Sequence, residues 1–185
     1  FALACAGPLL AGSQVSCEPT FDAAAALSRV EHEALTMLAL SPGQYAALAD
    51  VIAARGAPWH AAALRVCTVT DGIADAALQA RWAELTGLEL RQAFGVREAP
   101  IVTYNAPHFP NRRGTLGVPF PGVQTAVRHS ATAAPAGDSG TLCVRGAQVS
   151  NARLGDHSAA DGDDTWCDTG VRVRAHDDGT LELAD

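Results

Sequence analysis

The sequence predicts an α/β fold, in which strand-helix units of a parallel sheet are followed by a small β-barrel-like subdomain. In residues 1–100, short apolar runs alternate with segments of helical periodicity. After Pro100 the helical periodicity disappears, and short extended runs are separated by glycine and proline. The chain has 185 residues and 48% hydrophobic content, which is enough for a sizeable core. We therefore expect two subdomains, residues 1–100 and residues 101–185.

The first subdomain carries the signals of three helices alternating with three buried strands. Asp22 can cap the first helix, Ser41 before Pro42 begins the second, and Gly87 ends the third. Repeated strand-helix units of this length predict a parallel sheet covered by helices. The expected helices span residues 23–32, 42 to about 56, and 75–86, and the expected strands span residues 35–40, 65–70 and 88–94.

The second subdomain contains only short extended runs. The turn Asp177-Asp178-Gly179 separates the last two and predicts a hairpin. The expected strands span residues 101–104, 124–129, 141–144, 171–176 and 181–183. The acidic, glycine-containing stretch at residues 155–164 is expected to be a solvated loop, with a weak cation site as the alternative.

Composition excludes several classes of partner and chemistry. The net charge is -7, and the cations are scattered singly, so neither a nucleic acid nor an anionic membrane is an expected partner. All thirteen basic residues are arginines, so lysine-assisted phosphate or Schiff-base chemistry must come from outside this chain. The apolar residues 1–10 lack a preceding basic stretch and contain Gly7-Pro8, so they predict neither a signal peptide nor a membrane span.

The cysteines are odd in number and widely spaced, with no C-x-x-C pair that would indicate zinc binding or dithiol redox chemistry. Reduced thiols in a cytoplasmic protein are therefore the expectation. The histidines show no spacing typical of metal ligands. Since the chain has no initiating Met, we expect an internal piece of a longer protein.

Four segments follow one another in an order and spacing that indicate one enzyme family. They read LRQAFGVRE at residues 90–98, GTLGVP at residues 114–119, GTLCVRG at residues 140–146 and WCDTG at residues 166–170. In this order they resemble the core motifs of the adenylate-forming acyl-CoA synthetases, which join a carboxylic acid to AMP and then to the thiol of coenzyme A. The resemblance covers nearly the whole chain and implies an internal fragment of the family's large N-terminal domain.

The resemblance implies a first nucleotide-binding segment at Asp71, Gly72 and Ile73. These residues follow an expected strand, and in doubly wound sheets ligands lie beyond the carboxyl ends of the strands. They resemble the family's small-residue loop, whose backbone borders the adenine.

The second implied segment, residues 94–98, resembles the family motif aromatic-Gly-x-Thr-Glu. Phe94 would stack on adenine, Gly95 would let the backbone approach the nucleotide, and Glu98 would be a catalytic residue that helps to hold magnesium. Arg97 stands where the family has threonine, so a large cation replaces a small hydroxyl beside the α-phosphate. Taken alone, the same residues would also fit a strand-to-helix turn with an exposed glutamate.

The last segment resembles the family motif in which Thr-Gly is followed by an aspartate that binds both ribose hydroxyls. Here the next residue is Val171, which cannot accept hydrogen bonds. Asp168 lies three residues earlier and is the nearest substitute, although an odd offset on a strand places it on the opposite face. Thr141 replaces the glutamate of the family's Gly-Glu-x-x-x-x-Gly strand, and residues 152–153 replace its Gly-Tyr pair.

By resemblance, the parent protein would be an acid-CoA ligase that uses ATP with magnesium, a small carboxylic acid and coenzyme A. Its phosphate loop and the small C-terminal domain that carries the catalytic lysine would lie outside this sequence, so the fragment is not expected to be active alone. One alternative is a divergent member that only forms the thioester from a preformed acyl adenylate, since Arg97 and Val171 both depart at ATP-handling positions. Another is a non-catalytic adenylate-binding module.

One motif from a different class of enzyme also occurs. Residues 137–140 read GDSG, as around the nucleophile of trypsin-like serine proteases. That fold is nearly all β and needs a histidine well upstream on the same double barrel, whereas His32 and His60 lie in helical or linker sequence. A turn before a strand is the simpler interpretation.

Overall fold

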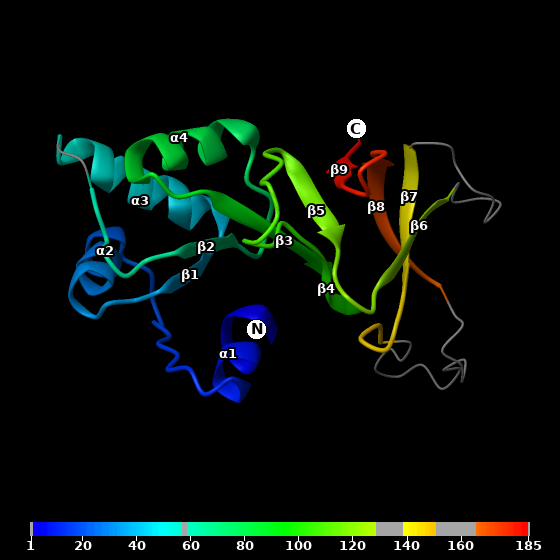
Figure 1. Ribbon diagram of the computed structural model, residues 1–185, viewed down its shortest axis with the longest axis horizontal. Coiled ribbons are helices and arrows are strands. Elements are labelled where there is room, and N and C mark those ends of the chain that lie inside the picture. Colours follow the sequence, from blue (N-terminus) through cyan, green and yellow to red (C-terminus); the bar gives the residue numbers. More distant parts are fainter. Residues whose placement is uncertain (1, 57–58, 129–138, 151–165, 185) are drawn as a thin grey trace. The chain divides into compact units, whose positions relative to one another are not determined.

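The computed structural model describes residues 2–56, 59–128, 139–150 and 166–184. The chain divides into two compact units, which we call unit 1 (residues 1–92 and 106–114) and unit 2 (residues 93–105 and 115–185). Figure 1 shows the elements of both. The acidic stretch at residues 155–164, with its alternative cation site, lies outside the described residues.

Two helices of unit 1 begin at the capping residues that the sequence indicates. Asp22 accepts a hydrogen bond from the Ala25 amide at 2.7 Å, and Ser41 forms a capping box with Gln44. Gly87 ends the last helix in a left-handed conformation. The helices are η1 (Ala2–Ala6), α1 (Gly7–Leu10), α2 (Ala23–His32), α3 (Pro42–Ala54) and α4 (Ala76–Thr86).

The sheet of unit 1 is parallel, as the sequence predicts. Its strands are β1 (Met37–Leu40), β2 (Val66–Val69) and the first part of β3 (Leu90–Val96). Met37 pairs with Val66, and Cys67 pairs with Leu90. Helices α3 and α4 lie side by side over this sheet (Figure 1). The α/β class predicted from the sequence is therefore confirmed.

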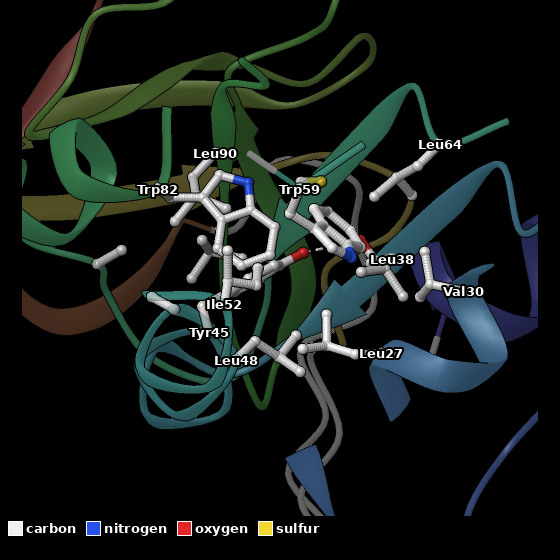
Figure 2. Close-up of a cluster of buried hydrophobic side chains, with 14 residues drawn as sticks. Leu27, Val30, Leu38, Tyr45, Leu48, Ile52, Trp59, Leu64, Trp82 and Leu90 are labelled. Atoms are coloured by element: carbon white, nitrogen blue, oxygen red, sulfur yellow. Dashed lines mark hydrogen bonds between the residues drawn. The ribbon is translucent and has the colours of Figure 1, made fainter. Parts of the chain in front are cut away.

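Aromatic and aliphatic side chains together form the core of unit 1 (Figure 2). The Tyr45 and Trp82 rings meet edge to face with centroids 4.9 Å apart. The Tyr45 hydroxyl donates to the carbonyl oxygens of Leu38 on β1 and Thr68 on β2, at 3.0 and 3.2 Å. The hydroxyl of the fully buried Tyr45 thus has hydrogen-bond partners. Through this one side chain, helix α3 is linked to both β1 and β2.

Unit 2 consists of antiparallel strands. Through the described residues they follow the order β3, β4, β5, β9, β8, β7, β6 without closing on themselves. The sequence predicts a barrel-like subdomain here, but the sheet is open because its outermost strands do not pair with each other. The strands after β3 are β4 (Ala99–Tyr104), β5 (Thr115–Pro119), β6 (Gln124–Arg128), β7 (Ser139–Arg145), β8 (Cys167–Ala175) and β9 (Leu181–Leu183).

Between β4 and β5 the chain returns to unit 1, in a segment (residues 106–114) that we call the strap. Arg113 forms an ion pair with Glu89 at 2.6 Å, and the Asn111 side chain donates to the Leu90 carbonyl at 3.0 Å. The Arg91 guanidinium donates to the Phe109 carbonyl at 2.8 Å. The strap is thus held by three consecutive residues around the start of β3.

No helix in the described part of the chain is long and apolar enough to cross a membrane.

Candidate functional site

The loop after β2 carries the first group of predicted site residues. The Thr70 amide donates to the Leu40 carbonyl at 2.9 Å, so the loop begins where β1 and β2 both end. Asp71 and Gly72 have φ values of 55° and 130°, both in the left-handed region. A Cβ atom on Gly72 would lie 3.1 Å from Cδ of Pro42, so both the backbone conformation and the space favour glycine. Asp71 and Gly72 are exposed, and Ile73 is half-buried.

Two buried glutamine side chains hold this loop from inside unit 1. The Gln92 amide nitrogen donates to the Gly72 carbonyl at 2.9 Å, and its oxygen accepts from the Ala74 amide at 3.0 Å. Gln79 on α4 donates to the Ala74 carbonyl at 2.8 Å. Gln92 is fully buried on β3, in sequence the second residue before Phe94. Neither glutamine is predicted from the sequence as a residue that holds the loop.

The second group, residues 94–98, lies on a β-hairpin rather than on a strand-to-helix turn. Val96 at the end of β3 pairs with Ala99 at the start of β4, which leaves Arg97 and Glu98 as the connecting turn. The pairing shifts register around Gly95, where a Cβ atom would overlap the carbonyl group of Pro100. Glycine is therefore required here by the close approach of β4.

The functional side chains of the hairpin differ in exposure. Phe94 and Glu98 are half-buried, whereas Arg97 is exposed. The Glu98 carbonyl accepts from the Ser150 amide at 2.7 Å, which fixes the turn. Across the part of the chain that the structure describes, neither the Arg97 nor the Glu98 side chain has a polar partner.

The Glu98 carboxylate could hold a magnesium ion only together with other ligands. The described residues contain no group of three or more His, Cys, Asp or Glu side chains that could hold a metal ion. Magnesium, however, is commonly held by one or two carboxylates together with substrate phosphates and water. Glu98 is compatible with a magnesium ion of that kind, and the described residues offer no all-protein cage for it.

The third group lies on β8. Along this strand, exposed residues alternate with less exposed ones: Asp168 is on the exposed face, and Val171 is on the face shared with the buried Val173. The Asp168 carboxylate accepts from the Gly170 amide at 2.8 Å. Asp168 and Val171 therefore point to opposite faces, as their odd offset predicts.

The predicted residues thus fall into three separate groups. Asp71, Gly72 and Ile73 belong to unit 1, whereas the hairpin and β8 belong to unit 2. Within unit 2, β5 and β9 lie between β4 and β8 in the sheet order. Two further motif segments also form strands, GTLGVP on β5 and GTLCVRG on β7.

The protease-like segment does not form part of a described triad. Ser139 begins β7, but Gly137 and Asp138 lie outside the described residues. His32 ends α2 in unit 1, with Nδ1 2.6 Å from the Ser28 carbonyl oxygen.

Comparison with known proteins decides between the two classes of enzyme. A family model described as "AMP-binding enzyme" matches residues 1–152, which include both the Asp71 loop and the β3–β4 hairpin. The chain belongs to the AMP-binding enzyme family. The resemblance stated from its motifs is therefore confirmed.

Relatives in this AMP-binding family include acid-CoA ligases. A long-chain-fatty-acid–CoA ligase of Salmonella typhimurium is 32% identical over 57% of this chain and 19% of its own length. A feruloyl-CoA synthase of Amycolatopsis is 29% identical over 99% of this chain and 38% of its own length. The chain thus spans about a fifth to two fifths of the curated relatives it matches.

Solved structures of AMP-binding relatives share the fold. A long-chain-fatty-acid-CoA ligase from Archaeoglobus fulgidus has a TM-score of 0.84 at 19% identity, covering 96% of this chain and 39% of that one. The amide bond synthetase McbA from Marinactinospora thermotolerans has a TM-score of 0.79 at 26% identity, covering 94% and 36%. The open α/β arrangement is therefore that of adenylate-forming enzymes.

Proposed function

We propose that this AMP-binding chain is part of a cytoplasmic acid-CoA ligase, which activates a small carboxylic acid with ATP and transfers the acyl group to coenzyme A. The observation that carries the proposal is the family match over residues 1–152, since it contains two of the three groups of site residues. The names of the Salmonella and Amycolatopsis relatives support coenzyme A as the acceptor.

In this proposal the loop and the hairpin bind the nucleotide. The backbone of Asp71, Gly72 and Ile73 borders the adenine, held in position by the Gln92 amide. The half-buried Phe94 ring stacks on the adenine, since an aromatic face offers stacking energy without a hydrogen-bond requirement.

Glu98 would hold magnesium, which when bound neutralises phosphate charge and orients the reacting oxygens. The Glu98 carboxylate supports this role because it is half-buried, fixed at a hairpin turn and has no polar partner among the described residues. Arg97 would lie next to the same phosphates and pair with them as a fixed cation.

The rest of the parent protein must supply the remaining chemistry. The present sequence contains no lysine. In this family a lysine of the small C-terminal domain takes part in adenylation, so we propose that this domain is the partner that completes the site.

Replacing Glu98 tests the proposal in the full-length protein. Glu98→Gln keeps the shape of the side chain and removes its charge, so CoA thioester formation from free acid and MgATP should fall about 100-fold or more. Glu84→Gln, an exposed position on α4, is the matched control and should leave the activity unchanged. If the Glu98→Gln enzyme were as active as the wild type, the assignment would be wrong.

A second candidate function keeps the fold and omits adenylation. The observations that favour it are Arg97 and Val171: a guanidinium replaces a small hydroxyl, and an apolar side chain replaces the ribose-binding carboxylate. Loss of two such hydrogen bonds would weaken adenosine binding by ~1 to 3 kcal/mol each. The nearest other carboxylate, that of Asp168, lies on the opposite face of β8 from Val171 and accepts a hydrogen bond from the Gly170 amide, which favours this second candidate.

The two half-reactions distinguish these functions. Thioester formation from free acid plus MgATP would be compared with thioester formation from a presynthesised acyl adenylate. Activity with both supports the complete ligase, and activity with the adenylate alone supports the second candidate. If neither reaction occurred while the acyl adenylate still bound, the chain would belong to a non-catalytic adenylate-binding module.

A further inference from the structure

Two cysteine thiols lie next to each other near the start of unit 1. The Sγ atoms of Cys5 and Cys17 are 3.9 Å apart. Cys5 is on η1 and is half-buried, whereas Cys17 lies in the segment between α1 and α2 and is exposed. By contrast, Cys67 and Cys143 are buried, and burial raises the pKa of the Cys67 thiol to about 12. The Cys5–Cys17 pair is therefore accessible in a way that the core thiols are not.

Local structure on both sides holds the two thiols together. After α1 the chain turns back, with the Ala11 amide donating to the Gly7 carbonyl at 3.0 Å and the Ser13 amide donating to the Pro8 carbonyl at 2.8 Å. On the far side of the turn, the neighbours of Cys17 are anchored to α2. Arg29 donates to the Ser16 hydroxyl at 2.5 Å and forms an ion pair with Glu18.

We infer that Cys5 and Cys17 form an oxidation-sensitive dithiol, which a low-molecular-weight disulfide converts to an intramolecular Cys5–Cys17 disulfide. A thiolate of the pair attacks one sulfur of the small disulfide, and one small thiol leaves. The second protein thiolate then attacks the resulting mixed disulfide and displaces the other small thiol. The two protein sulfurs together lose two protons and two electrons, and the small disulfide is reduced to two thiols.

The surroundings of the pair favour this chemistry over metal binding. A structural zinc site needs four ligands, and no third His, Cys, Asp or Glu joins the pair within the described residues. The contact with the Cys5 thiol raises the pKa of Cys17. Closing the disulfide brings the two sulfurs from 3.9 Å to about 2.05 Å.

Mass spectrometry of the full-length protein tests the inference. The protein would be equilibrated with increasing ratios of oxidised to reduced glutathione, alkylated and digested with trypsin. No lysine or arginine lies between Cys5 and Arg29, so one tryptic fragment carries both thiols. We expect this fragment to lose the mass of two hydrogen atoms and to take up no alkylating label. Cleavage after Leu9 or Leu10 should then leave its two halves joined.

Single substitutions provide the controls. In Cys17→Ser, Cys5 should carry a glutathione adduct instead of closing the disulfide. Cys167→Ser removes a half-buried thiol of unit 2, so the Cys5–Cys17 disulfide should form in it as in the wild type. The inference would be overturned if Cys5 and Cys17 stayed fully alkylatable at ratios that modify Cys167. Separate glutathione adducts on both thiols of the wild type would overturn it as well.

Discussion

Gln92 shows how one buried amide can fix a loop that is otherwise exposed. Replacing it with leucine keeps a similar volume but leaves the Gly72 carbonyl and the Ala74 amide without this partner. The Ala74 amide is buried, and an unsatisfied buried group costs about 1 to 3 kcal/mol, so we expect Gln92→Leu to destabilise the protein by at least about 1 kcal/mol. Urea unfolding followed by tryptophan fluorescence would measure the change.

The matched control for this prediction is Gln14→Leu. Gln14 is exposed, and surface substitutions of this kind usually change the free energy of unfolding by less than about 0.5 kcal/mol. An equal effect of the two substitutions would show that the amide contacts to the loop do not stabilise it.

Gly95 is a residue of the sequence motif, and the packing of the hairpin also requires glycine at this position. A methyl group at this position would overlap the Pro100 carbonyl and lie 2.8 Å from the Ala99 carbonyl oxygen. Because these are backbone atoms, β4 itself would have to move, and we expect Gly95→Ala to cost about 3 kcal/mol or more. Gly43→Ala on α3 is the control: nothing lies within 4 Å of the added carbon, so stability should be unchanged or slightly higher. Differential scanning calorimetry would compare the two variants.

At the scale of single elements, capping decides where helix α3 begins. The Ser41 hydroxyl accepts from the Gln44 amide at 3.4 Å, and the Gln44 side chain accepts from the Ser41 amide at 2.9 Å. Removing the hydroxyl in Ser41→Ala should lower the free energy of unfolding by about 1 kcal/mol. The midpoint of urea unfolding would report this loss. Ser13→Ala, at an exposed position outside any helix, should leave the midpoint where it is.

Elements whose ends are marked by a capping residue or a turn are predicted well from the sequence. Helix α2 has the predicted bounds, as does β9, because a cap or a hairpin turn marks their ends. Strand β5 and helix α1 are not predicted. In β5, Gly117 packs against the backbone of Tyr104 and Asn105, so a residue that reads as a turn signal lies inside a strand. The short helix has no side-chain cap to indicate it.

At the scale of the whole molecule, ion pairs link stability to pH. The Arg113 guanidinium holds the pKa of Glu89 below its ordinary value, and hydrogen bonds from Trp59 and Arg55 do the same for Glu31. The unfolded chain therefore binds protons at a higher pH than the folded one. The stability that these two carboxyl groups contribute should be fully present at neutral pH and be lost progressively as pH falls below about 5.

Urea midpoints measured from pH 7 to pH 3 would check this expectation. Glu89→Gln removes one of the shifted carboxyl groups, so its loss of stability on acidification should be smaller than that of the wild type. Glu84→Gln, without an ion pair among the described residues, should follow the wild-type curve. An identical pH dependence in all three proteins would contradict the assignment to Glu89.

For the molecule as a whole, the sequence indicates the family and the order of the motifs. It does not indicate which segments form each unit or how the strands of unit 2 pair. The motif residues Phe94 and Glu98 are recognisable because their chemistry is local. Gln79 and Gln92 are not, since their role depends on a loop that is distant in sequence. Likewise, the open sheet of unit 2 depends on long-range strand pairing, which short-range periodicity does not determine.

The strap also bears on how the protein is made. Glu89 and Arg91 emerge from the ribosome before their partners Arg113 and Phe109, and the first segment of unit 2, residues 93–105, is synthesised in between. Unit 1 therefore cannot be completed until Gly114 has been translated. A nascent chain shorter than this leaves the Leu90 carbonyl without its Asn111 partner, and it leaves this side of β3 as an unpaired edge that another strand could join.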